Sequence, residues 1–143
     1  MNVGDILNMK GDDVYSVHPH QSVAEAAHVL AEHRIGVVLV RHRGEVIGIL
    51  SERDIMRAIT DHKAAALIMQ VRNFMSSPVQ TCSPGDSVAK AVETMNGRRI
   101  RHLPVVNLGS LVGMLSITDI VKYRLSEKQK EVAALRDYAV AMG

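Results

Sequence analysis

Residues 46–55 read VIGILSERDI and residues 111–120 read LVGMLSITDI, so one ten-residue pattern occurs twice in the chain. The two segments are related by a constant shift of 65 residues, which needs no gap from position 14 to position 57. A repeat of this kind indicates two copies of one supersecondary unit, neither of which is expected to bury its sheet alone. Further matched positions are Pro19 and Pro84, Ser22-Val23-Ala24 and Ser87-Val88-Ala89, Arg34-Ile35 and Arg99-Ile100, and Gly44 and Gly109.

Each copy is predicted to fold as β-α-β-β-α, which places the chain in the α/β (α+β) class. Ser22 followed by Glu25 is the spacing of a reciprocal capping box at the start of a helix. The continuous apolar run at 35–40 is typical of a strand that is covered on both faces. In the first copy the expected elements are a strand at 14–17, a helix from Ser22, a strand at 35–40, a turn at 41–44, a strand at 46–50 and a helix from Ser51 to Arg57.

Two stretches lie outside the copies, and they complete the predicted organisation. The tail has apolar residues at heptad spacing, which favours packing on the parent domain or on a second copy, and a homodimer is expected. Two heptads are too short for a stable coiled coil by themselves. The predicted parts are a first repeat at 3–58, a linker helix at 59–70, a second repeat at 71–123 and a C-terminal helix at 124–143.

Composition excludes several classes of protein. Of 143 residues, 47% are apolar, 22% charged and 3% aromatic, which fits a globular chain with an aliphatic core. The net charge of +2 and the scarcity of aromatic residues argue against nucleic-acid binding. The single cysteine, Cys82, is expected to be a buried apolar filler, and no apolar run is long enough to cross a membrane. These features predict a cytoplasmic protein.

The repeated Ser-x-x-Asp segments, Ser51 to Asp54 and Ser116 to Asp119, are the first candidate sites. This spacing is itself a capping box, in which the carboxylate accepts the N–H of the serine. The same position, where a strand ends and a helix begins, also suits a ligand, since an acidic side chain there can bind ribose hydroxyls. Spacing alone leaves both interpretations open.

A second candidate is the basic segment from Arg98 to Pro104, whose cations are expected to enter a buried strand. Burying a cation is costly unless it meets an anion, and arginine suits bidentate phosphate contacts. A solvated loop that pairs with nearby carboxylates is the alternative interpretation. Gly36 stands where the second copy has Arg101, and a glycine there would let a ligand approach the backbone. The two copies are therefore expected to differ in phosphate binding.

Together, VIGILSERDI, LVGMLSITDI, RIRHLPVV at 99–106 and the two Pro-x-x-Ser-Val-Ala helix starts resemble the cystathionine-β-synthase (CBS) domain family, in its tandem-pair arrangement called a Bateman module. The resemblance covers roughly residues 3 to 123. It implies two repeats related by pseudo-two-fold symmetry, with two clefts that bind adenine nucleotides. The ligands implied are AMP, ADP, ATP or NAD(H), and no metal is expected.

The resemblance also implies which residues line the clefts. Asp54 and Asp119 would bind ribose, and Ser51, Ser116 and Thr118 would contact ribose or phosphate. Arg53 stands where the second copy has Thr118, a departure that would either add a phosphate ligand or obstruct the cleft. The Asp119 cleft would be lined by Tyr15, Ile35, Gly36, Val37 and Arg101, and the Asp54 cleft by Val79, Gln80, Ile100 and His102.

The function expected is therefore a non-catalytic nucleotide sensor with an unidentified protein partner. The alternative is a structural or interaction module in which the Ser-x-x-Asp segments are only helix caps. A third hypothesis, single-stranded nucleic-acid binding through Arg98, Arg99 and Arg101, conflicts with the composition. The seven histidines are expected to be solvated, because His18 and His20, and His28 and His33, lack metal-binding spacing on one helix face.

Overall fold

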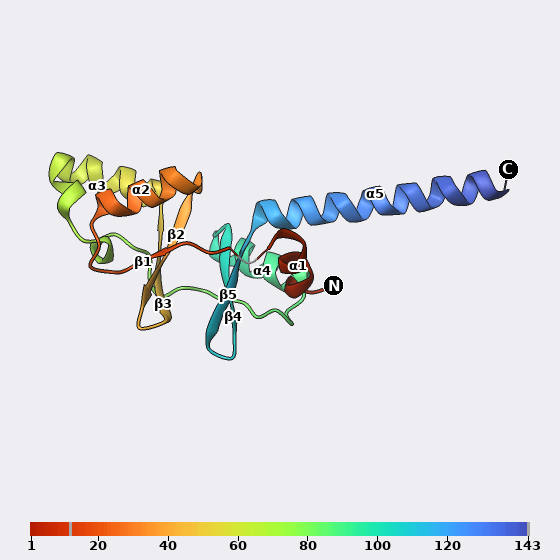
Figure 1. The fold of residues 1–143 in the computed structure, drawn as a ribbon, viewed down its shortest axis with the longest axis horizontal. Helices are drawn as coiled ribbons and strands as arrows, with labels where there is room; N and C mark the ends of the chain where they lie inside the picture. Colours follow the sequence, from red (N-terminus) through yellow and green to blue (C-terminus); the bar gives the residue numbers. More distant parts are fainter. Residues whose placement is uncertain (12, 143) are drawn as a thin grey trace. The chain divides into compact units, whose positions relative to one another are not determined.

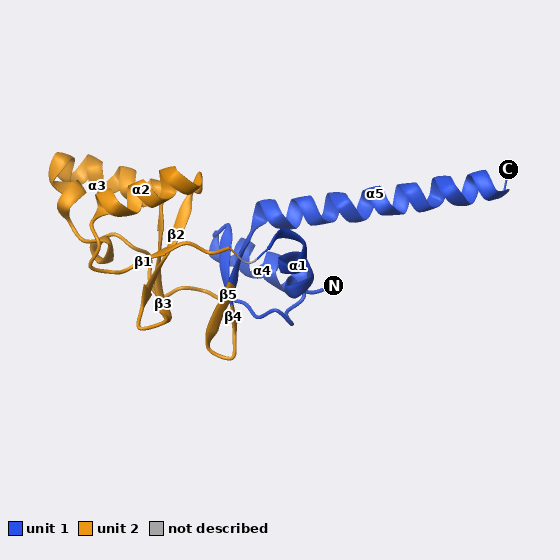
Figure 2. Cartoon of the chain, in the orientation of Figure 1, with its two compact units in different colours: residues 1–12, 82–105, 113–143 blue, residues 13–81, 106–112 orange. Residues whose placement is uncertain are grey.

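The computed structural model describes residues 1–11 and 13–142, and its elements are shown in Figure 1. Figure 2 shows two compact units, each assembled from segments that are far apart in the sequence. Unit 1 contains residues 1–12, 82–105 and 113–143, and unit 2 contains residues 13–81 and 106–112. The boundaries of these units differ from those of the two contiguous repeats predicted from the sequence. The repeat boundaries themselves stay predictions.

Unit 2 contains a three-stranded sheet in the order β1-β2-β3, with β1 parallel and β3 antiparallel to β2. Helix α2 contacts β2, α3 contacts β3, and the two helices contact each other, so the buried apolar side chains lie between helices and sheet. The elements are β1 (Ser16–Val17), α2 (Val23–His33), β2 (Val37–His42), β3 (Glu45–Ser51), α3 (Glu52–His62) and the 3₁₀ helices η1 (Lys63–Ile68) and η2 (Val71–Asn73). The core contains Val17, Val23, Ala26, Leu30, Val38, Val40, Leu50, Ile55 and Val71.

Unit 1 contains the first helix of the chain and most of the second repeat. Helices α1 and α4 both contact α5. Cys82 forms a parallel bridge to Val105, which matches the pairing of Val17 with Val40 in the first repeat. Cys82 is buried, as predicted, and burial raises the pKa of its thiol to about 11. The elements are α1 (Val3–Lys10), α4 (Val88–Arg98), β4 (His102–Asn107), β5 (Ser110–Ser116) and α5 (Ile117–Met142); β4 pairs with β5, and the end of this hairpin, residues 106–112, is grouped with unit 2.

Both pairs of long strands are joined by the same tight turn. Arg43 has φ 51° and Gly44 has φ 81°, and Leu108 and Gly109 have the same two values. Two consecutive positive φ angles define a type I′ turn, whose twist matches that of the strands it joins. Glycine at the second position removes the Cβ clash that this conformation imposes.

The strand predicted from residue 35 begins later, at Val37, because residues 34 and 35 end the preceding helix. Arg34 adopts the left-handed conformation (φ 53°, ψ 46°), and the Ile35 N–H donates to the Leu30 carbonyl at 3.0 Å. The second repeat ends its helix in the same way at Arg99 and Ile100. This closing turn satisfies carbonyls that the helix would otherwise leave without a partner.

Three other expectations need correction. Strand β1 contains Ser16–Val17 rather than 14–17, and α3 continues past Arg57 to His62, beyond which η1 replaces most of the predicted linker helix. The capping box predicted at Ser22 is incomplete. The Ser22 hydroxyl accepts the Glu25 N–H at 3.1 Å, but the Glu25 carboxylate accepts from the competing donor Gln21 at 2.8 Å.

Matched glycines in the middle of β3 and β5 allow close packing of a neighbouring segment. A Cβ placed on Gly48 would overlap the sulfur of Met75 and lie 2.8 Å from its Cγ, and one on Gly113 would lie 2.9 Å from Cδ2 of Leu7. Both distances are shorter than van der Waals contact. The neighbouring side chains would have to move to admit even one methyl group.

We expect Gly48→Ala to lower the free energy of unfolding by about 1–3 kcal/mol, the usual cost of overpacking a core. Met75→Ala also lowers stability, because it removes apolar contacts, but it opens the space that the new methyl group needs. The double variant should therefore lose less stability in urea denaturation than the sum of the two single variants. Strictly additive losses would contradict the close packing of Gly48 against Met75.

Candidate functional site

The first Ser-x-x-Asp segment forms the complete capping box at the start of α3. The Ser51 N–H donates to Oδ2 of Asp54 at 2.8 Å, and the Asp54 N–H donates to the Ser51 hydroxyl oxygen at 3.2 Å. The Ser51 hydroxyl also donates to Oδ2 at 3.0 Å. The capping interpretation of this spacing is confirmed, and Asp54 is held at the point where β3 ends and α3 begins.

The second segment forms the same arrangement at the start of α5. The Ser116 N–H donates to Oδ2 of Asp119 at 2.9 Å, and the Asp119 N–H donates to the Ser116 hydroxyl oxygen at 3.1 Å. Both aspartates are partly buried, whereas Arg53 and Thr118, the residues before them, are exposed. The two repeats thus present a carboxylate in the same backbone setting.

Capping uses only one oxygen of each carboxylate. Every hydrogen bond that Asp54 and Asp119 accept through their side chains within the described chain ends on Oδ2. Since a carboxylate has two acceptor oxygens, Oδ1 of each aspartate keeps its capacity for an external donor such as a hydroxyl group. A capping role and a ligand role are therefore compatible in the same residue.

We call the point where β3 meets α3 the Asp54 junction and the point where β5 meets α5 the Asp119 junction. Lys10, at the end of α1, distinguishes the Asp119 junction from the Asp54 junction. Its ammonium group lies 2.7 Å from Oδ2 of Asp119 and donates to the Met114 carbonyl, also at 2.7 Å. The interaction joins the first helix to the start of the last one within unit 1. Sequence reasoning missed Lys10, because no pattern links a residue near the N-terminus to a carboxylate 109 positions away.

The electrostatics of this junction follow from partial burial and from Lys10. Burial by itself would raise the pKa of Asp119, but the hydrogen bonds from Lys10 and Ser116 and the charge of Lys10 outweigh it, so the pKa lies below its ordinary value. Burial lowers the pKa of His102; Asp119 opposes that shift, while Lys10 and Arg101 add to it. Asp119 is therefore anionic and His102 neutral near pH 7.

The strand-entry loop of each repeat lies beside the helix start of the same repeat. The Glu52 N–H donates to the Gly36 carbonyl at 3.0 Å, and the Ile117 N–H donates to the Arg101 carbonyl at 2.9 Å. Gly36 and Arg101 occupy matched positions, so the backbone is the same while the side chain differs. The second repeat therefore carries an exposed arginine side chain on this loop where the first repeat has none.

The basic segment of the second repeat is not buried, contrary to the expectation that its cations enter a covered strand. Arg98 ends α4, Arg99 is its left-handed cap, and β4 starts only at His102. The side chains of Arg98, Arg99 and Arg101 are exposed, so they carry no desolvation cost that an anion must offset. The segment is solvated, as the alternative interpretation expects, but none of these three arginines forms an ion pair with a carboxylate among the described residues, and the phosphate interpretation stays a prediction.

The other predicted lining residues fall into the two units. Unit 2 holds Asp54 together with Ser51, Arg53, Tyr15, Ile35, Gly36, Val37, Val79 and Gln80, and unit 1 holds Asp119 together with Ser116, Thr118, Ile100, Arg101 and His102. Tyr15 is half-buried and stacks on the ring of His33 with centroids 3.7 Å apart. That these residues line clefts shared by the two repeats stays a prediction.

Histidines in unit 2 form a small cluster, but not a metal centre. Nδ1 of His42 lies 3.2 Å from Nε2 of His18, and the ring of His20 lies 5.0 Å from that of His18. Among the described residues, no three His, Cys, Asp or Glu side chains are placed to hold a metal ion. The structure also contains, within those residues, no helix of the length and apolarity needed to span a membrane.

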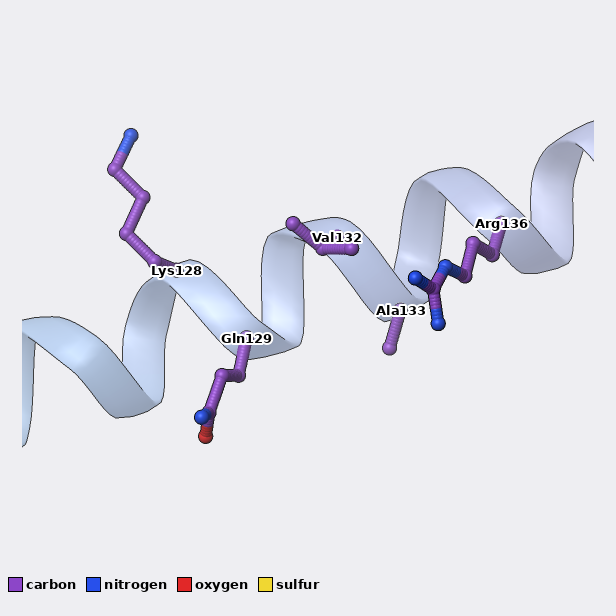
Figure 3. Close-up of a pocket in the computed structure, with 5 residues that line it drawn as sticks. All are labelled: Lys128, Gln129, Val132, Ala133 and Arg136. Atoms are coloured by element: carbon purple, nitrogen blue, oxygen red, sulfur yellow. The ribbon is translucent and has the colours of Figure 1, made fainter.

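A shallow surface hollow lies on α5 rather than at either aspartate. Its lining residues are Lys128, Gln129, Val132, Ala133 and Arg136 (Figure 3). Lys128 is nine residues beyond Asp119, which corresponds to about 13 Å along a helix. The hollow therefore belongs to the exposed part of α5 and not to the junction.

Comparison with known proteins supports the repeat. The sequence profile of the CBS domain family matches residues 3–61 and 71–126. The CBS domain-containing protein CBSX3, mitochondrial, of Arabidopsis thaliana is 30% identical over 145 residues, which cover 95% of this chain and 70% of that protein. The crystal structure of the CBS-domain containing protein ATU1752 from Agrobacterium tumefaciens is 41% identical, with a TM-score of 0.82 over 87% of this chain and 99% of that one.

A further solved structure carries ligands. The CBS domain pair of protein MJ0100, crystallised with 5-methylthioadenosine and S-adenosyl-L-methionine, is 25% identical with a TM-score of 0.78, over 89% of this chain and 98% of that one. The two profile matches coincide with the two copies of the internal repeat and together cover most of the chain. The protein therefore belongs to the CBS domain family, as a tandem pair of CBS domains.

Proposed function

We propose that this CBS pair is a non-catalytic regulatory module that binds an adenine nucleotide, with AMP, ADP, ATP and NAD(H) as the candidate ligands, and that it acts as a homodimer on a protein partner. The observation that carries the proposal is the free Oδ1 of Asp54 and Asp119 beside a capped helix start. A ribose offers vicinal hydroxyl donors, which a carboxylate fixed in this way is suited to accept.

Family membership supports an adenosine-containing ligand. Protein MJ0100, a CBS pair of the same fold, was crystallised with 5-methylthioadenosine and S-adenosyl-L-methionine, both of which contain adenosine. Aliphatic side chains and backbone amides can hold the adenine ring, so the low aromatic content of 3% is compatible with adenine binding. The clefts shared by the repeats and the cytoplasmic location expected from the sequence stay predictions.

The charges at the Asp119 junction favour a phosphorylated ligand there. Lys10 is hydrogen-bonded to Asp119, and the exposed guanidinium of Arg101 belongs to the loop whose carbonyl accepts the Ile117 N–H. A helix N-terminus adds a positive partial charge to these two cations. At the Asp54 junction the corresponding loop position is Gly36, and Arg53 is the nearest cation in the sequence.

A second candidate function is a structural module in which both aspartates are only caps. The completeness of both capping boxes favours it, since every serine and aspartate in them already has a structural partner. The two candidates differ in one measurable property, the response to a ligand. The first predicts a ligand response that can be lost separately from the stability that the caps provide. The second predicts no ligand response.

We expect adenine nucleotides at millimolar concentration to raise the melting temperature of the full chain, and Asp119→Ala to remove or strongly reduce that rise. The reason is that the variant loses the oxygen that accepts the ribose hydroxyls. Differential scanning fluorimetry with AMP, ADP, ATP, NADH, 5-methylthioadenosine and S-adenosyl-L-methionine measures both effects, with Asp54→Ala testing the other junction.

A matched control for the loss of a cap exists in α1. Asn2 and Asp5 form the same reciprocal capping box, with both hydrogen bonds at 3.0 Å, outside the two repeated junctions. Asp5→Ala should cost about 1 kcal/mol of stability, as cap loss does elsewhere, and leave the ligand response intact. The nucleotide proposal fails if no adenosine compound shifts the melting temperature of the wild-type chain.

Lys10→Met should weaken the binding of AMP more than that of 5-methylthioadenosine, which has no phosphate. The substitution removes a cation next to Asp119 but keeps the apolar stem, and isothermal titration calorimetry compares the two ligands. Lys90→Met is the control, because Lys90 pairs with Asp86 at 3.5 Å in the same unit, away from the junction. Equal losses for both ligands would contradict a phosphate role for Lys10.

The same variant should change acid stability in a defined direction. The folded-state pKa of Asp119 is depressed, so its stabilising contribution is present above the unfolded-state pKa of about 4 and is lost as the pH falls through the lower folded value. Lys10→Met should therefore lower the melting temperature at pH 7 but have little effect near pH 2. A loss of the same size at both pH values would indicate that Lys10 stabilises by packing alone.

A further inference from the structure

The second half of α5 is a helix without a covering element. All residues from 128 to 142 are exposed, with Val132 48% and Leu135 68% accessible, whereas Ile120 and Tyr123 in the first turns are buried. An isolated helix of about 15 residues is marginal in water, because its formation costs more backbone entropy than its own hydrogen bonds return. A partner that covers this segment would therefore stabilise it as a helix.

The apolar residues of α5 follow a heptad pattern over three heptads. Alternating spacings of four and three residues place them on one face, as the a and d positions of a coiled coil require. The a positions are Leu125, Val132 and Ala139, and the d positions are Val121, Lys128, Leu135 and Met142. All seven side chains are exposed in the single chain, so the face is available along its whole length.

We propose that α5 pairs with α5 of a second copy of this chain as a parallel, in-register, two-stranded coiled coil. The proposal rests on the homodimer proposed above and adds the surface that forms it and the orientation of the two helices. It requires no rearrangement of the helix, because the seven a and d residues, which we call the seam, already share one face.

Charge complementarity selects the parallel orientation. In a parallel pair, each g position faces the following e position of the other helix, which brings Glu131 to Arg136 of the second copy, twice per dimer. The other complete pair joins Arg124 to Gln129 and is free of repulsion. An antiparallel pair that aligns Val132 with Lys128 would instead set Glu131 against Glu131 and Lys122 against Arg136, two repulsive contacts.

Lys128 is the one charged residue on the seam. In Figure 3 it projects on the same side of α5 as Val132, and its ammonium lies 3.7 Å from Glu131 on the same helix. This ion pair lowers the cost of placing two lysines near each other in a dimer. A single polar residue at a core position restricts register at the expense of stability, so Lys128 should limit the affinity of the dimer.

The test is sedimentation equilibrium of the full chain, with paired variants on and off the seam. Leu135→Glu should weaken self-association at least about tenfold, whereas Ala134→Glu, one residue earlier and outside the seam, should not. Lys128→Leu should tighten the dimer by about tenfold, and Lys130→Leu, on the outer face, should leave it unchanged. A gain of affinity cannot arise from misfolding, so Lys128→Leu keeps the test informative.

Orientation is tested by oxidative crosslinking. Leu135→Cys places two thiols in one d layer of a parallel dimer, so a disulfide-linked dimer should form, while Ala134→Cys should give none; the buried Cys82 is common to both. A dimer that requires Leu135 but gives no crosslink overturns the parallel register.

Two other outcomes overturn the inference. If the wild-type chain dimerises and neither Leu135→Glu nor Lys128→Leu changes its self-association, the proposed homodimer stands but α5 is not the surface that forms it. If the wild-type and Lys128→Leu chains both stay monomeric at 100 μM, the homodimer and the α5 coiled coil are both wrong. The apolar face of α5 would then be a surface for a different protein. The ligand response is measured separately on the same variants, so a failed nucleotide proposal is distinguishable from a failed coiled coil.

Discussion

The reciprocal hydrogen bonds of Ser51 with Asp54, and of Ser116 with Asp119, are the interaction on which the rest of the structure depends. Each joins a strand with buried apolar side chains to a helix whose first amides have no partner within the helix. A cap at this point stabilises the helix start and sets the direction in which it leaves the sheet. The same bonds hold a carboxylate rigidly at the end of a strand with one oxygen unused. The structural role and the proposed binding role therefore do not compete for Asp54 or Asp119.

The two repeats keep this backbone and differ in the charges around it. Gly36 and Arg101 accept the same helix-start hydrogen bond through their carbonyls, so their side chains could change without altering the turn. Lys10 adds a cation to the second junction alone, from a helix that lies outside both junctions in the sequence. Because a charged group acts over several ångströms at a half-buried site, these differences would alter which ligand each junction favours in the proposed binding role, while the fold stays the same.

Much of the fold follows from the sequence because it depends on local patterns. The β-α-β-β-α order, the type I′ turns ending in Gly44 and Gly109 and both Ser-x-x-Asp caps need only short-range spacing. The errors arose where a tertiary or competing local contact decided the outcome. Ile35 is as apolar as the strand after it, but its N–H closes the preceding helix, and the Glu25 carboxylate accepts a hydrogen bond from Gln21 instead of from the Ser22 N–H. Lys10 could not be found at all, since its partner is distant in the sequence and an exposed lysine at a helix end is common.

Helix α5 links the proposed ligand site to the proposed dimer surface. Asp119 lies in its first turn, and the seam runs from Val121 to Met142 on one continuous helix of 26 residues, about 39 Å long. Continuity alone does not couple the two sites. A ligand shifts a dimer equilibrium only by as much as its affinity differs between monomer and dimer. For a ligand at Asp119, such a difference would have to come from how the start of α5 is held, and Lys10 is one group through which α1 contacts that start.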